Sequence, residues 1–291
     1  MNAAREIGVG SARQYYQKMS ELPRRKRPTM ARWCDLEDEL DRWREAGRIA
    51  TLWWRDDDAA TADARLDRLL SICADVPISL AVIPAAAGPE LAACLAQPCR
   101  SDRPAPIGIL QHGWRHMNHA GDGRKSEFPP GRSSHAIASE LAAGQARLKG
   151  LFGTRALAVL VPPWNRLDHS FLLLLIDCGL SGISQVKPRC TACPAPGITE
   201  VNVHVDLVSW AGDRGFIGEA EALGGIVGHL RARRLIELDA SEPTGILTHH
   251  LVQDERTETF LRQLVTVTRT HPAARWLDAA SVFRDAVGQP V

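Results

Sequence analysis

Acidic and imidazole side chains occur at two places in this chain in an arrangement that suits a metal ion. Three consecutive aspartates, Asp56, Asp57 and Asp58, follow the apolar run RIATLWW. Adjacent carboxylates repel one another, and a bound cation would offset that repulsion. His112 and His116 are four residues apart, which places both imidazoles on one face of a helical turn. Two imidazoles and one carboxylate leave positions open for water and substrate, and a second aspartate can stay free as a base.

Each part of this arrangement also has a simpler interpretation. The aspartates could form a solvated acidic turn that caps a helix beginning near Thr61. The spacing of His112 and His116 is a weak signal by itself, and only the acidic cluster makes the metal site the better interpretation. His119 is a rival third ligand, although its place in a loop makes its geometry harder to fix.

Alternating strand and helix patterns position these residues. Strand-like runs are predicted at 48–54, 77–84, 105–111, 156–162, 180–184, 199–207 and 244–250. Helical patterns are predicted at 31–47, 61–76, 133–153, 169–179, 218–234 and 255–270. This alternation is typical of a parallel sheet with helices outside it, and six to eight such units favour a closed or nearly closed barrel.

The polar segments fall where the predicted strands end. The aspartates follow the first strand, HGWRH the third and VPPWN the fourth, while DLVSW follows a later strand and THH ends another. The carboxyl ends of parallel barrel strands form one rim, where active sites are assembled. We therefore expect these five segments to meet at one mouth of the barrel. The loop at 117–134 is either a substrate-contacting lid or a solvated loop.

In this order the segments RDDDA, HGWRH, VPPWN, DLVSW and LTHH resemble the five motifs of the polysaccharide deacetylases with NodB homology, carbohydrate esterase family 4. The resemblance covers roughly residues 50–250. It implies an α/β fold, a distorted (β/α)7 barrel of the NodB type. It also implies a metal-dependent hydrolase that removes N-acetyl or related acyl groups from an amino sugar or carbohydrate, at a carbon–nitrogen amide bond that is not a peptide bond.

The resemblance assigns the metal ligands and the base. Asp58, His112 and His116 would bind the ion, which we expect to be Zn²⁺, with Co²⁺, Ni²⁺ or Fe²⁺ as alternatives. Asp57 would be the general base acting on the metal-bound water. A slip of one residue, with Asp56 as the base and Asp57 as the ligand, stays open.

The same resemblance assigns the acid. His249 matches the last motif and would protonate the leaving amine, with His250 as its competitor. Asp206 would orient or tune that histidine. The ion and a backbone N–H would hold the oxyanion of the reacting carbonyl.

Three positions depart from the motifs. Val161 replaces an arginine that orients the base, so activation of the base depends on Arg55 or Arg166 taking its place. Ser209 replaces the second acid of the fourth motif, and Gly113 replaces a hydroxyl-bearing residue. These changes indicate a divergent branch. The alternatives are an amidohydrolase acting on a small or cyclic amide, and a degenerate barrel that binds sugar or metal without turnover.

The substrate is expected to contact residues of the rim segments and of the loop. These are Trp114, His119, Pro163, Trp164, Asn165, Arg166, Trp210 and His250. The three tryptophans suit stacking on sugar faces and packing at the barrel mouth equally well.

Bulk properties limit the partners. The 291-residue chain has 35 basic and 34 acidic side chains, a net charge of +1, which gives no field for nucleic acid. We expect no membrane segment, no secretory signal, a cytoplasmic location with reduced cysteines, a flexible tail at 1–29 and one barrel domain at 30–291. Cys190 and Cys193 form a CxxC pair without a second pair nearby, so we expect an ordinary loop there. The oligomeric state is not indicated.

Overall fold

The computed structural model describes residues 30–96, 105–212 and 214–285, and the tail expected at 1–29 lies outside them. One sheet of parallel strands forms the centre of the described structure, in the order β6-β5-β4-β3-β2-β1-β8-β7 with β9 paired to β1. The strands are β1 (Ala50–Ala59), β2 (Ile78–Val82), β3 (Ile107–His112), β4 (Ala156–Val161), β5 (Gly182–Ile183), β6 (Thr199–Glu200), β7 (Val205–Asp206), β8 (Thr244–Thr248) and β9 (Ala274–Trp276).

The extended segment 199–206 joins the two ends of the sheet. Its first part, β6, pairs with β5, and its last part, β7, pairs with β8. The backbone N–H of His204 also donates to the carbonyl of Gly245. The single strand predicted at 199–207 is therefore divided into two short pairings, which distort the barrel as the NodB resemblance implies.

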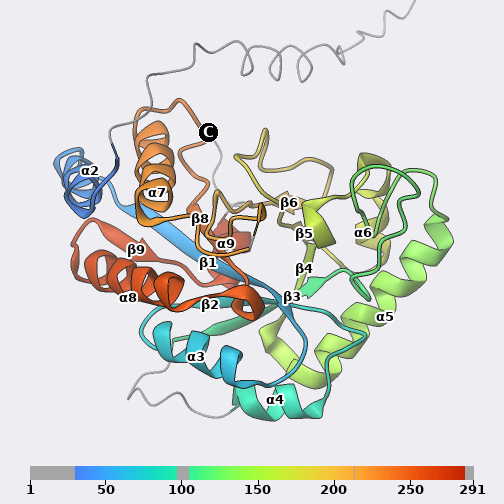
Figure 1. Ribbon diagram of the computed structural model, residues 1–291. Coiled ribbons are helices and arrows are strands. Elements are labelled where there is room, and N and C mark those ends of the chain that lie inside the picture. Colours follow the sequence, from blue (N-terminus) through green and yellow to red (C-terminus); the bar gives the residue numbers. More distant parts are fainter. Residues whose placement is uncertain (1–29, 97–104, 213, 286–291) are drawn as a thin grey trace, which may run out of the picture.

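Helices surround the strands. They are α2 (Trp33–Glu45), α3 (Ala64–Ile72), α4 (Pro89–Ala96), α5 (Ser134–Phe152), α6 (Leu174–Asp177), α7 (Glu219–Arg234), α8 (Glu255–Thr270) and α9 (Ala279–Asp285). Figure 1 shows α2, α7, α8, α3, α4 and α5 around the outside of the sheet. Side-chain caps fix several helix starts: Asp63 accepts from the N–H of Leu66, and Asp254 accepts from that of Thr257. No helix in the described parts of the chain is both long and apolar enough to cross a membrane.

The two tryptophans that precede the aspartates face opposite sides of β1. Trp53 belongs to the buried cluster inside the barrel, with Val201 and Leu247, whereas Trp54 packs in the layer between sheet and helices. Successive side chains of a strand alternate in this way. Helix α9 fills the end of the barrel at which the strands begin. Its residue Phe283 packs against Gly182 of β5, where an added Cβ would lie 2.9 Å from the Phe283 ring.

Two further elements differ from their sequence predictions. Strand β1 was predicted to end at Trp54 but continues through all three aspartates to Ala59. The three carboxylates do not need solvent, because Asp56 is bound by Thr248, Asp57 by Arg55 and Asp58 by His112. The helix predicted at 169–179 is broken into a 3₁₀ turn, His169–Phe171, and the single turn of α6. Asp168 caps that 3₁₀ turn by accepting from the N–H of Ser170. A run this short and uniformly apolar gains little from continuing as one helix.

Candidate active site

The three aspartates of β1 point in three different directions. In a regular strand Asp56 and Asp58 would share one face. The register between β1 and β2 shifts here, since Asp56 pairs with Leu80 but Ala59 pairs with Val82. Asp58 also has a φ of 71°, which is uncommon outside glycine and marks local constraint. The irregularity turns Asp58 away from the face that Asp56 occupies.

Asp56 is fully buried and lies behind the rim. Its carboxylate accepts hydrogen bonds from Thr248 Oγ1 at 2.6 Å and from the backbone N–H of His250 at 3.0 Å, and it contacts His250 Nδ1. Although burial lowers the pKa of His250, the Asp56 carboxylate outweighs it and holds that pKa above its usual value. Asp56 and His250 therefore bind each other and are not free for a metal ion or substrate. This favours Asp57 as the base and Asp58 as the ligand over Asp56 and Asp57, and it favours His249 over His250 as the acid.

Asp58, His112 and His116 converge on one point at the C-terminal ends of β1 and β3. Asp58 Oδ1 lies 3.1 Å from Nε2 of His112 and 3.2 Å from Nε2 of His116, and the three ligand atoms are within 4.8 Å of one another. Nδ1 of His112 is 2.9 Å from the Val161 carbonyl, to which it donates, so the lone pair lies on Nε2. A lone pair, a second imidazole and a carboxylate that face one another fit a divalent cation.

Of the two arginines that the sequence offers as partners of the base, Arg55 is the one that contacts Asp57. Its side chain and that of Asp57 lie two residues apart on the same face of β1. The guanidinium donates from Nε to Asp57 Oδ1 at 2.8 Å and from Nη2 to Oδ2 at 2.9 Å. Ser184 Oγ and Asn165 Oδ1, both at 2.7 Å, hold the same guanidinium. Arg166, the other candidate, instead donates to the Lys125 carbonyl.

His249 and Asp206 lie side by side at the ends of the neighbouring strands β8 and β7. Nδ1 of His249 lies 3.9 Å from Asp206 Oδ1, beyond hydrogen-bond distance. Trp210 Nε1 donates to Asp206 Oδ2 at 2.7 Å, and its ring stands edge-on to His249 with centroids 4.7 Å apart. Burial raises the pKa of Asp206 despite these partners. Trp210, half exposed, thus forms part of the wall beside His249.

The other residues expected to contact substrate separate into two groups. Trp164 packs against His116 with centroids 4.3 Å apart, and Asn165 and Arg166 line a cleft of about 510 Å³ between the 120–130 loop and the 165–168 segment. Trp114 lies beside Arg115 in a different hollow, His119 is exposed, and His250 faces Asp56. Pro163 is buried.

The sequence analysis did not identify two polar residues of the site. Ser184 and Gln185 follow β5 and hold Arg55 through a hydroxyl and a carbonyl. Their position after a strand was the available signal, but neither residue type indicates chemistry alone. Cys190 and Cys193 are exposed in a loop and belong to neither group of possible metal ligands in the described residues.

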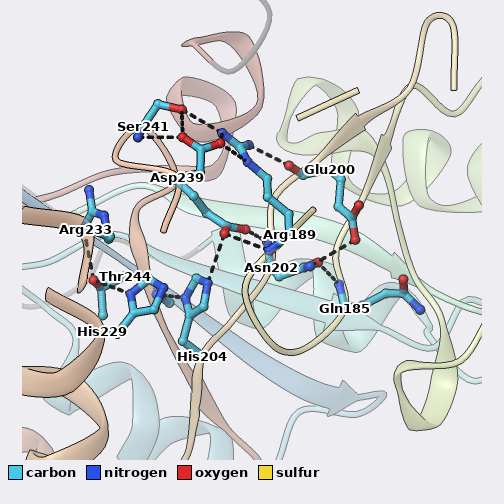
Figure 2. A network of polar contacts seen from close by, with 12 residues as sticks. Gln185, Arg189, Glu200, Asn202, His204, His229, Arg233, Asp239, Ser241 and Thr244 are labelled. Atoms are coloured by element: carbon cyan, nitrogen blue, oxygen red, sulfur yellow. Dashed lines mark hydrogen bonds and ion pairs between the residues drawn. The ribbon is translucent and has the colours of Figure 1, made fainter. Parts of the chain in front are cut away.

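The second such group, His204, His229 and Glu242, lies where β8 begins, away from the rim (Figure 2). The N–H of Gly245 donates to Nδ1 of His204, so the neutral ring carries its proton on Nε2, which faces Glu242 Oε2 at 3.3 Å. That nitrogen has no lone pair for an ion. The rings of His204 and His229 are stacked with centroids 3.6 Å apart, which does not suit two in-plane ligands of one ion. We interpret this group as a buried polar network.

This network predicts a loss of stability in acid. Burial lowers the pKa of His204 to about 3 and that of His229 to about 2, and it raises the pKa of Glu242 to about 7. Near pH 5.5 the unfolded chain holds about two protons on these two imidazoles, while the folded chain holds only the Glu242 proton. This difference of one proton should make the network lower the free energy of unfolding by about 1.4 kcal/mol for each pH unit of acidification. In His229→Gln the one remaining histidine proton of the unfolded chain balances the Glu242 proton of the folded chain, so the slope should be smaller than that of wild type by about this amount.

Urea unfolding at several pH values between 4.5 and 6.5, with a chelator present, measures these slopes. His135→Gln, which replaces an exposed histidine, is the matched control and should keep the wild-type slope. Parallel slopes in wild type and His229→Gln would contradict the prediction.

Comparisons with known proteins place this fold in a class. No family model matches the chain, and no curated protein matches its sequence. Several solved structures resemble it, among them the following three. The first, from Mycobacterium smegmatis and classed with the polysaccharide deacetylases, is 16% identical with a TM-score of 0.59 and covers 84% of this chain and 92% of its own. A Streptococcus mutans CE4 esterase is 15% identical with a TM-score of 0.51, covering 83% and 90%. A family 4 acetyl xylan esterase from Clostridium thermocellum, in complex with a cobalt ion, is 15% identical with a TM-score of 0.50, covering 80% and 90%.

These likenesses confirm the architecture expected from the five motifs. The chain has the distorted β/α barrel fold of the deacetylase class. More particularly, it has the NodB-like fold of the polysaccharide deacetylases and CE4 esterases.

Proposed function

We propose that this protein is a metal-dependent hydrolase that removes N-acetyl or related acyl groups from an amino sugar or carbohydrate. The observation that carries the proposal is the convergence of Asp58, His112 and His116 beside Asp57, whose carboxylate is held separately by Arg55. The neighbours of the same fold are a deacetylase-class protein and esterases, which supports this choice of reaction. A single barrel domain over 30–291 and a cytoplasmic location belong to the same proposal.

Asp58, His112 and His116 would hold the ion, with Zn²⁺ our first choice because imidazole and carboxylate ligands suit it. When bound, such an ion supplies a Lewis acid for the carbonyl and lowers the pKa of water. Asp57 Oδ would accept the proton of the attacking water, since Arg55 holds its carboxylate in place next to Asp58 in the chain. His249 would donate a proton to the nitrogen that leaves, and Asp206, whose Oδ1 lies 3.9 Å from Nδ1 of His249, would tune that ring through its charge.

The Arg55–Asp57 pair argues against the degenerate barrel. That alternative depended on the missing arginine of the third motif. In the structure the guanidinium of Arg55, on β1, binds the Asp57 carboxylate. Asn165 lines a cleft of about 510 Å³ and also accepts a hydrogen bond from Arg55, so space for a substrate larger than a small cyclic amide lies beside the Arg55–Asp57 pair. A panel of N-acetylated sugars and oligosaccharides beside small cyclic amides would separate these two classes.

Metal binding tests the proposal directly. Wild-type protein freed of metal should bind one Zn²⁺ per chain in a calorimetric titration. His116→Gln should weaken binding by at least about 10-fold, because one of three ligands is lost. His119→Gln, which changes an exposed histidine of the following loop, should bind like wild type. Unchanged binding in His116→Gln with a loss in His119→Gln would refute this ligand set.

A further inference from the structure

The turn between the two metal-site histidines is held by a carboxylate from the following loop. Glu127 is 1% exposed, and it accepts from the backbone N–H of Trp114 at 3.2 Å and from that of Arg115 at 2.8 Å. Both donors lie between His112 and His116. A carboxylate that binds two successive N–H groups fixes the path of the backbone between them.

Gly113 makes room for this carboxylate. Its φ is +56°, and a Cβ added there would lie 1.9 Å from Glu127 Oε2 and 2.7 Å from the Pro163 ring. The carboxylate of Glu127 therefore occupies the space in which any side chain at position 113 would stand. If position 113 carried a Cβ, Glu127 could not keep its present place.

Glu127 is itself anchored in the fold. Its carbonyl accepts from Arg132 Nη1 at 3.1 Å, and Arg132 also reaches Glu140 of α5 at 2.7 Å. The next residue, Phe128, is fully buried in the core beside α5. The position of the turn is thus set by α5 and the core through Glu127.

We propose that Glu127 is a positioning residue for the metal site, whose carboxylate replaces the side chain that the second motif carries at position 113. It acts through the backbone of the turn and sets the approach of His116 to Asp58. His116 has a φ of 56°, a backbone conformation that needs such support. The role rests on the proposed function, in which the two histidines are ligands of one metal ion.

The first test compares Glu127→Gln with Glu90→Gln. The amide oxygen of Gln can accept one N–H, but its NH₂ would face the second, so the turn loses a hydrogen bond. We expect Glu127→Gln to bind Co²⁺ and Zn²⁺ about 10–100-fold more weakly than wild type and to alter the visible absorption of bound Co²⁺, which reports ligand geometry. Glu90→Gln makes the same change at an exposed position of α4, outside the contacts that hold the turn, and it should match wild type.

The second test replaces Gly113 in two backgrounds. Gly113→Ala should weaken Co²⁺ binding strongly in the wild-type background, where Glu127 fills the space, and at least about 5-fold less strongly in a Glu127→Ala background. Equal losses in both backgrounds, or wild-type affinity in Glu127→Gln, would overturn the positioning role and leave the proposed function intact. Failure of the wild-type protein to bind either ion would overturn both.

Discussion

Replacing Asp57 by asparagine is expected to lower kcat/KM on an N-acetylated sugar by about 10²–10⁴-fold, the range that a general base contributes. Asparagine keeps the shape of the side chain but cannot accept the proton of the attacking water. Zn²⁺ binding should persist, because the metal-site ligands are Asp58, His112 and His116 and the Asp57 carboxylate faces Arg55. Steady-state kinetics and calorimetric titration on the same protein preparation measure the two quantities.

Asp38→Asn is a suitable control for this experiment, since it neutralises an exposed carboxylate of α2 and should leave both quantities unchanged. Equal rates for wild type and Asp57→Asn would remove Asp57 from the chemistry. A parallel loss of Zn²⁺ binding would instead mean that Asp57 is a ligand, and the assignment would move back by one aspartate.

Removal of the Arg55 side chain charge is expected to be the most destabilising of these changes. Arg55 and Asp57 are both buried, and Arg55→Gln leaves the carboxylate without its guanidinium. Breaking a buried pair on one side typically lowers the free energy of unfolding by about 3–5 kcal/mol. Arg55→Gln should also lower the rate, because the guanidinium no longer holds the Asp57 carboxylate in place. Urea unfolding and steady-state rates measure both effects.

Arg166→Gln is the matched control, because Arg166 was the other candidate from the sequence and its guanidinium reaches the Lys125 carbonyl. Its stability should stay within about 0.5 kcal/mol of wild type. In an Asp57→Asn background, Arg55→Gln should cost less stability than in wild type, since no buried carboxylate is left unpaired. Additive losses would show that the pair is not coupled.

Several features of the molecule were predictable from the order of residues alone. The strand–helix alternation determined a parallel barrel, because apolar strands with helices between them must bury both faces of one sheet. The same order placed five polar segments at the C-terminal ends of strands: the aspartates, HGWRH, VPPWN, DLVSW and THH. A parallel barrel brings all these strand ends to one rim. The convergence of Asp58, His112 and His116 follows from this topology.

Local pattern could not decide which neighbouring residue faces the mouth. Asp56 and Asp58 would share a face in a regular strand, and only the register shift against β2 and the positive φ of Asp58 separate them. His249 and His250 are equally polar, and only the buried partner Asp56 turns His250 away from the mouth. Such choices depend on atoms that are distant in sequence.

The sequence by itself determined the barrel, the rim and the residue types that gather there, because these follow from periodicity and topology. Only the tertiary structure decided that Arg55 holds the Asp57 carboxylate and that Glu127 fills the space beside Gly113. The physical reason is that a charge or a volume can be supplied from any strand or loop that reaches the same point. Compensation of this kind leaves no trace in the spacing of a motif.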